Sequence, residues 1–202
     1  MGQRGVPAAA DDRTDGGRGL NQVFTIGHGA REEAEFLGLL RAAEVEFLLD
    51  VRRFPGSRRH PQFGRDALAG SLAAAGVRYE WHGETLGGRR IRRPETRHTA
   101  LRNASFAGYA DHMDSEEFRR AVDDLVRRAE SGERLAVMCA ETLWWRCHRS
   151  FVADALVLRG VEVTHLLRPG EVQRHRTHPT LRRDADGWPV YDVPDTLPLD
   201  GS

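Results

Sequence analysis

The sequence contains no lysine, so all thirty of its basic side chains are arginine. GC-rich coding favours arginine over lysine, and this absence therefore excludes no function. The chain also has only two cysteines among its 202 residues. Two cysteines can form at most one disulfide, which excludes a small domain held together by several of them. In a reducing compartment they indicate buried thiols, metal ligands or reactive groups.

Long apolar runs are missing as well. No segment approaches the roughly 18 consecutive apolar residues that a membrane-spanning helix needs. The N-terminal residues are polar, glycine-rich and charged, without the apolar core of a secretory signal. We therefore expect a cytoplasmic protein that does not bind membranes.

Positive charge is concentrated in one part of the chain. Residues 51–102 contain twelve arginines against four acidic residues, although the net charge of the whole chain is zero. A local excess of this size favours an anionic partner, either a small molecule or a nucleic acid. The alternative is a solvated basic surface that binds no ligand.

Apolar patterning predicts strands that alternate with helices. Residues 1–22 lack apolar periodicity and are predicted to form a disordered leader, whereas the prolines of residues 171–202 predict an irregular tail. Between them, residues 23–170 are predicted to form one α/β domain of three layers, with a mostly parallel central sheet flanked by helices. The predicted strands cover residues 23–26, 45–51, 77–81, 135–139 and 161–167.

Ionisable side chains follow three of these predicted strands. His28 comes after the first strand, Asp50 and Arg52 after the second, and Cys139 and Glu141 after the fourth. Ligands of open parallel α/β sheets bind beyond the carboxyl ends of the strands. The pattern therefore predicts a polar site at this edge of the sheet.

The segment 139–148 reads C-A-E-T-L-W-W-R-C-H and allows three kinds of site. A helix that begins near Arg146 would offer free backbone amides, which together with Arg146 and Arg149 would bind a phosphate or carboxylate. Cys147, in the first turn of that helix, would be a thiolate nucleophile. The structural alternative is that Cys147 packs in the core.

The third kind of site is a metal centre. Cys139, Cys147 and His148 offer soft ligands that would take zinc or iron, with Glu141 or His28 completing the set. Adjacent residues on a helix diverge by about 100 degrees, which disfavours joint ligation by Cys147 and His148. In the structural alternative, His148 forms a hydrogen bond with the end of a strand.

Other residues are weaker candidates for ligand binding. Asp50 could orient Arg52 toward a ligand or form an internal ion pair with it. Gly87, Gly88 and Arg89 could donate backbone amides to a phosphate or form a plain turn. Trp145 could stack on a base or provide hydrophobic cover.

Four separated motifs carry a resemblance to a known family. They are T-I-G-H at 25–28, L-D-V-R-R-F-P-G-S-R-R at 49–59, L-G-G-R at 86–89, and M-C-A-E with C-H-R between 138 and 149. In this combination the chain resembles the family called domain of unknown function 488, from about residue 23 to residue 167. The resemblance implies no activity. It implies the following signature positions: His28, Asp50, Arg52, Pro55, Ser57, Gly87, Gly88, Cys139, Glu141, Cys147, His148 and Arg149.

Together these features favour an enzyme, possessing hydrolase or lyase activity, that acts on a nucleotide or nucleic acid. Cys139 or Cys147 would be the nucleophile or a ligand, and the predicted acid–base and orienting groups are His28, Asp50, Glu141 and His148. The predicted substrate-binding residues are Arg52, Arg53, Ser57, Arg58, Gly87, Gly88, Arg89, Trp145, Arg146 and Arg149. The alternatives are a nucleic-acid-binding module without catalysis and a metal-binding regulatory protein.

Overall fold

A three-layer α/β architecture organises the computed structural model, which describes residues 21–56 and 59–193. The central sheet has six strands in the order β3-β2-β4-β1-β5-β6, and only β6 runs antiparallel to its neighbour. This confirms the predicted fold class. The strands of this sheet are β1 (Gln22–Gly27), β2 (Phe47–Asp50), β3 (Arg78–Trp81), β4 (Leu135–Cys139), β5 (Glu162–Arg168) and β6 (Glu171–Arg174).

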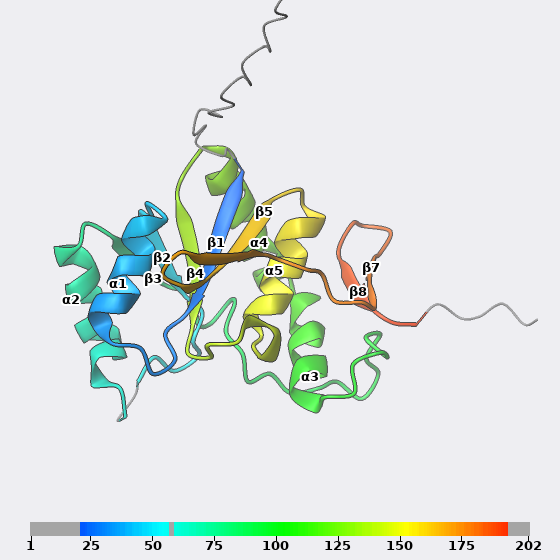
Figure 1. The fold of residues 1–202 in the computed structure, drawn as a ribbon. Helices are drawn as coiled ribbons and strands as arrows, with labels where there is room; N and C mark the ends of the chain where they lie inside the picture. The colour runs from blue at the N-terminus through cyan, green and yellow to red at the C-terminus, as the bar shows by residue number, and fades with distance from the viewer. Residues whose placement is uncertain (1–20, 57–58, 194–202) are drawn as a thin grey trace, which may run out of the picture.

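Helices cover both faces of the sheet. Helices α1 (Glu33–Ala42) and α2 (Arg65–Ala74) lie on one side of it in Figure 1, and α4 (Glu116–Glu130) and α5 (Arg149–Leu158) lie on the other. Helix α3 (Ala104–Met113) packs with α4. No helix in the described ranges is long and apolar enough to cross a bilayer.

Strand β4 shows how the sequence produces this layering. All five of its residues are buried, because both faces of a central parallel strand are covered. Leu135, Val137 and Cys139 join the core beneath α3, α4 and α5, whereas Ala136 and Met138 join the core beneath α1 and α2. The side chain of Cys139 therefore points toward the α5 side of the sheet, as the alternation of a strand requires.

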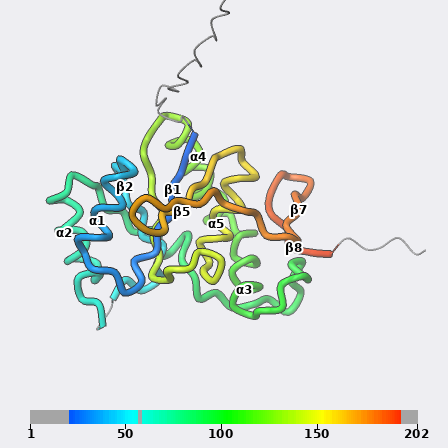
Figure 2. Tube along the Cα trace, viewed as in Figure 1, coloured from blue at the N-terminus to red at the C-terminus, as the bar shows by residue number. Residues whose placement is uncertain are grey.

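The C-terminal region differs from the predicted irregular tail. Residues 171–174 add the edge strand β6, and β7 (Leu181–Arg183) pairs with β8 (Pro189–Tyr191) in a hairpin. The prediction is wrong for these strands because each has only three or four residues, which is too few to show a recognisable alternation of apolar and polar side chains. Strand β8 contacts α3 and α5, and Figure 2 shows the hairpin beyond α5. Trp188 and Tyr191 are buried there.

A short 3-10 turn precedes α5 and shifts its start. The turn η2 covers Trp144–Arg146, and Cys147 has an extended backbone with φ of −130° and ψ of 144°. The α-helix therefore begins at Arg149, later than the predicted start near Arg146. Because Cys147 is extended, the side chains of Cys147 and His148 are not oriented as neighbours on a regular helix would be.

Candidate functional site

A pocket of about 780 Å³ opens where β1, β2 and β4 end. In the register of the sheet, Gly27 pairs with Cys139 and Asp50 pairs with Met138, so the three strands end level with one another. The loops that follow them consequently meet at one edge. The predicted site residues that line the pocket are His28, Arg52, Arg53, Gly88, Arg89, Cys139, Glu141, Arg146, Cys147 and His148.

Asp50 and Arg52 form a buried ion pair beneath this pocket. The Asp50 carboxylate accepts hydrogen bonds from the Arg52 Nε at 2.8 Å and Nη2 at 2.6 Å, and from the Tyr79 hydroxyl at 2.8 Å. Arg52 also donates to the carbonyl of Phe63 at 2.8 Å. Asp50 is fully buried, so its carboxylate orients Arg52 and does not face a ligand.

His28 is held in one tautomer by the same arginine. An arginine can only donate, so the Arg52 Nη1 at 3.2 Å requires an unprotonated Nε2 on His28. The Nδ1–H then donates to the carbonyl of Gly29 at 2.9 Å. Burial and the Arg52 charge lower the pKa of His28 to about 4. The ring is therefore neutral at physiological pH. The lone pair on its Nε2 already accepts the hydrogen bond from Arg52.

Cys139, Cys147 and His148 form a compact cluster on the wall of the pocket. The His148 Nδ1 lies 3.9 Å from the Cys139 Sγ and 3.8 Å from the Cys147 Sγ. All three potential ligand atoms lie within 4.8 Å of one another, and both cysteines are buried. Cys139 and His148 are nine positions apart in sequence and come together because the loop after β4 turns back toward the start of α5. We call these three residues the thiol–imidazole cluster.

The two thiols of this cluster differ in their acidity. The hydrogen bond from Cys147, together with His148, holds the pKa of Cys139 well below its ordinary value. Burial raises the pKa of Cys147 well above that value. Cys139 is therefore the more acidic thiol of the pair, as expected when the loss of a proton from one of two close thiols opposes its loss from the other.

Arg149 holds the loop that carries the cluster. Its guanidinium donates to the backbone carbonyl of Glu141 and, at 2.8 Å, to that of Thr142. The side chain is only 1% exposed and does not line the pocket, so it is not available to a ligand there. On the other side of this loop, a Cβ at Gly27 would lie 2.0 Å from the Glu141 carbonyl oxygen. The strand β1 therefore needs glycine at its end.

The pocket has a strongly positive lining. Five arginines and one carboxylate, that of Glu141, contribute to it. Arg52 is paired with Asp50, but among the described residues no carboxylate pairs with the remaining four arginines. An unpaired guanidinium is a donor for phosphate or carboxylate oxygens. These four residues are Arg53, Arg59, Arg89 and Arg146.

Some predicted residues lie outside the pocket. The backbone of Gly87 packs against that of Gly83, where a Cβ would lie 2.0 Å from the Gly83 carbonyl oxygen. Trp145 is 51% exposed and its ring contacts Trp144 edge-on, so it covers that residue and does not line the pocket. Ser57 and Arg58 fall outside the described residues.

Several lining residues were not among the predicted ones. Arg59 and His60 continue the basic motif after Pro55 and could have been recognised by that position. Tyr109 gave no such signal, because it belongs to the apolar stripe of α3. Its hydroxyl donates to the Leu86 carbonyl at 2.7 Å, and its ring lies 5.0 Å from that of His148.

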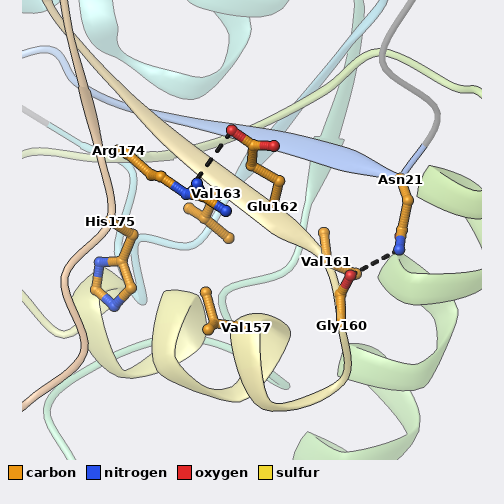
Figure 3. Close-up of a pocket in the computed structure, with 8 residues that line it drawn as sticks. All are labelled: Asn21, Val157, Gly160, Val161, Glu162, Val163, Arg174 and His175. Carbon is orange, nitrogen blue, oxygen red and sulfur yellow. Dashed lines mark hydrogen bonds and ion pairs between the residues drawn. The ribbon is translucent and has the colours of Figure 1, made fainter.

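A second, smaller cavity of about 390 Å³ lies at the opposite end of the strands. Figure 3 shows its lining, in which Asn21 donates to the Gly160 carbonyl at 2.7 Å and Arg174 faces Glu162 at 3.9 Å. These polar groups are paired with one another. No cysteine is among the residues that line this cavity, and its ionisable groups are Glu162, Arg174 and the imidazole of His175.

That imidazole belongs to a buried hydrogen-bonded chain. His165 Nδ1 lies 2.6 Å from the Thr25 hydroxyl, and its Nε2 lies 3.0 Å from His175 Nδ1. The His175 Nε2 then donates to Asp154 at 2.8 Å, and the Tyr191 hydroxyl donates to the same carboxylate at 2.9 Å. Sequence patterning gave no sign of this arrangement. We call these five residues the histidine chain.

Comparison with known proteins finds a family model that matches the chain. The family described as Domain of unknown function DUF488 matches residues 33–156, which is more than half of the chain. The matched range includes the thiol–imidazole cluster and the Asp50–Arg52 pair but begins after His28. No curated protein and no solved structure matches the chain.

Proposed function

We propose a function from the geometry of the pocket, because this chain belongs to DUF488, a family described as a domain of unknown function. The proposed function is that of an enzyme that binds a phosphate-bearing ligand, a nucleotide or a nucleic acid, and transforms it at the thiol–imidazole cluster. The observation that carries this proposal is that unpaired arginines and two buried sulfurs line one pocket.

Charge supports the choice of ligand. A phosphate carries more negative charge than a single carboxylate, and the unpaired arginines would each offer it charge-assisted hydrogen bonds. The pocket of about 780 Å³ is also large enough for a ligand of nucleotide size. Arg53 and Arg146 come from different loops, so a ligand that contacts both would be fixed across the pocket.

Chemistry would take place at the thiol–imidazole cluster, which lines the same pocket as the arginines. Cys139 would supply the more acidic of the two thiols, and Glu141 supplies an exposed carboxylate that lines the same pocket. His28 and Arg52 are positioning residues in this proposal, because the Nε2 of His28 already accepts from Arg52. This role for His28 replaces the acid–base role that its place after β1 predicted.

Ligand binding can be tested with ATP and with a fluorescently labelled single-stranded oligonucleotide. We expect Arg53→Ala and Arg146→Ala each to weaken binding of the preferred probe about tenfold, since each removes a charge-assisted contact. The matched control is Arg120→Ala, which removes the same charge from the exposed surface of α4, outside the lining of the pocket. Fluorescence anisotropy and calorimetry would give the dissociation constants.

Turnover is tested on the same probes with Cys139→Ser and Glu141→Gln. We expect product formation by the unchanged protein and its loss in both variants while binding persists. If neither probe binds, or if Arg120→Ala weakens binding as much as Arg53→Ala, the pocket is not the anion site. If binding persists without turnover on any nucleotide or nucleic acid, the enzyme assignment fails.

A second candidate is a nucleic-acid-binding module without catalysis. It is favoured by a separate observation, the exposed segment that leads away from the pocket. Arg89, Arg92 and Arg93 are exposed on it, and Ile91 is 91% exposed. An extended basic surface of this kind would follow a phosphate backbone. The logarithm of its affinity would then fall linearly with the logarithm of the salt concentration, with a slope set by the number of phosphates contacted.

A further inference from the structure

The geometry points to a zinc site formed by Cys139 Sγ, Cys147 Sγ and His148 Nδ1, with a fourth coordination position open to the arginine-lined pocket. This inference rests on the proposed function and specifies the group that would act on the ligand. No other set of three such side chains gathers in the part of the chain that the structure describes.

The spacing of the three atoms fits a tetrahedral ion. The two sulfur–nitrogen distances are 3.9 Å and 3.8 Å. Bond lengths of about 2.3 Å to sulfur and about 2.0 Å to nitrogen place such ligands roughly 3.5 Å apart around zinc. The two sulfur–nitrogen pairs therefore need to contract by only a few tenths of an ångström. All three potential ligand atoms already lie within 4.8 Å of one another.

The imidazole presents the correct atom. His148 Nε2 lies 3.1 Å from the backbone carbonyl of Val51, and because a carbonyl can only accept, the proton belongs on Nε2. The lone pair is then on Nδ1, the atom that faces both sulfurs. A hydrogen bond from the second ring nitrogen to a carbonyl is the usual support of a metal-binding histidine, since it fixes the tautomer and the ring orientation.

The backbone at Cys147 allows the three side chains to converge although Cys147 and His148 are adjacent in sequence. Cys147 has an extended backbone, with φ of −130° and ψ of 144°. The two side chains are therefore free of the separation of about 100 degrees that neighbouring residues have on a helix.

The character of the donors selects the metal. Two thiolates and one imidazole are a soft set with a tetrahedral preference, which suits zinc better than magnesium or calcium. Three protein ligands and one open position are typical of catalytic zinc sites, whereas structural sites have four protein ligands. Zinc at this position would supply Lewis-acid activation of a bound ligand or water. Glu141 would be the nearest free carboxylate of the pocket lining.

The test is elemental analysis of the full chain, produced in zinc-supplemented medium and purified without chelator. We expect about one zinc ion per chain, as a single tetrahedral site requires. We also expect its loss in Cys139→Ser, Cys147→Ser and His148→Gln. The matched control is His82→Gln, which changes a partly buried histidine outside the cluster and should retain the zinc. Cobalt substitution adds a readout, because thiolate-to-cobalt charge-transfer absorption reports sulfur ligation directly.

The outcomes separate this inference from the proposed function. A folded, unchanged protein that neither contains zinc nor takes it up overturns the site, as does zinc retained in all three variants. Stoichiometric iron overturns the assignment to zinc. If a variant does not fold, the cobalt spectrum of the unchanged protein decides alone, since absent charge-transfer absorption overturns the site. Zinc without binding of ATP or oligonucleotide refutes the proposed function and leaves the site intact.

Discussion

The thiol–imidazole cluster and the histidine chain are both buried and polar, yet their hydrogen bonding differs. In the histidine chain each imidazole nitrogen has a partner at 3.0 Å or less. In the cluster, the Nδ1 of His148 faces two sulfurs at 3.8 Å and 3.9 Å beside an open pocket. A network in which every polar atom has a partner stabilises a fold. Sulfur and nitrogen atoms that lie beside a cavity without close partners are instead candidates for binding a ligand.

The largest difference should appear in stability. Asp154 is 1% exposed and accepts hydrogen bonds from His175 and Tyr191. We expect Asp154→Ala to lower the free energy of unfolding by about 3 to 5 kcal/mol, because both donors would remain buried without an acceptor. Urea denaturation would measure the loss.

The matched variant in the cluster is Cys139→Ala, studied in metal-free protein. It removes one sulfur beside a pocket and should cost about 1 kcal/mol, the ordinary value for a single substitution. Equal losses in Asp154→Ala and Cys139→Ala would show that both regions are structural and would remove the distinction between them.

The pH dependence of stability should show an effect between those of Asp154→Ala and Cys139→Ala. Burial, with the charges of His175 and Arg149, lowers the pKa of His165 from 6.5 to about 2. Below about pH 6.5 the unfolded chain takes up a proton at this imidazole but the folded protein does not, so stability falls as the pH falls. At about pH 5 the loss from His165 is about 2 kcal/mol. We expect His165→Asn to flatten this part of the urea-derived stability profile.

A steeper profile in His165→Asn than in the unchanged protein would contradict this expectation. His28 should add its own loss at lower pH, because its pKa is also lowered, to about 4. The two histidines therefore act in the same direction, although only one of them lines the pocket.

A small stability effect, similar to that of Cys139→Ala, is expected at Gly88. A Cβ there would lie 2.9 Å from the Nδ1 of His148, so Gly88→Ala should displace the imidazole. We expect a stability loss of about 1 kcal/mol and a loss of zinc affinity of about tenfold to a hundredfold, as when the support of a metal ligand is changed. Competition with a chromophoric chelator would measure that affinity.

Gly70→Ala is the control for this substitution. Gly70 lies in α2, and no atom would lie within 4 Å of an added Cβ. Alanine is the better helix former, so this variant should be slightly more stable than the unchanged protein and should bind zinc normally. Unchanged zinc affinity in Gly88→Ala would mean that the imidazole is not a ligand.

Much of the sheet could be predicted from sequence because its strands are short, continuous apolar runs. Such runs mark buried parallel strands, and the loops after them must meet at one edge. Residues 135–139 were therefore placed correctly, and the family resemblance was confirmed over 33–156. His28, Arg52 and Cys139 were predicted to lie close together because the strands that precede or contain them end at the same edge of the sheet.

The partners of polar side chains could not be predicted in the same way. Arg149 resembles a ligand-binding residue in sequence, but it holds two carbonyl groups of a loop. Asp154 lies on α5 and His175 directly follows β6, so their hydrogen bond joins elements that are distant in sequence. Such contacts depend on side-chain geometry between distant elements, about which the local pattern carries no information. The short strands β6, β7 and β8 escaped recognition for a related reason, since their pairing decides their conformation.

The strand order has a consequence for synthesis of the chain on the ribosome. Strand β1 pairs only with β4 and β5, and β4 separates it from β2. During translation, β1 therefore has no strand to pair with until β4 has been synthesised, more than a hundred residues later. An apolar strand with free edges is a target for aggregation and for chaperones during this interval. Slow translation before residue 135 would lengthen this exposure, and rapid delivery of β4 would end it.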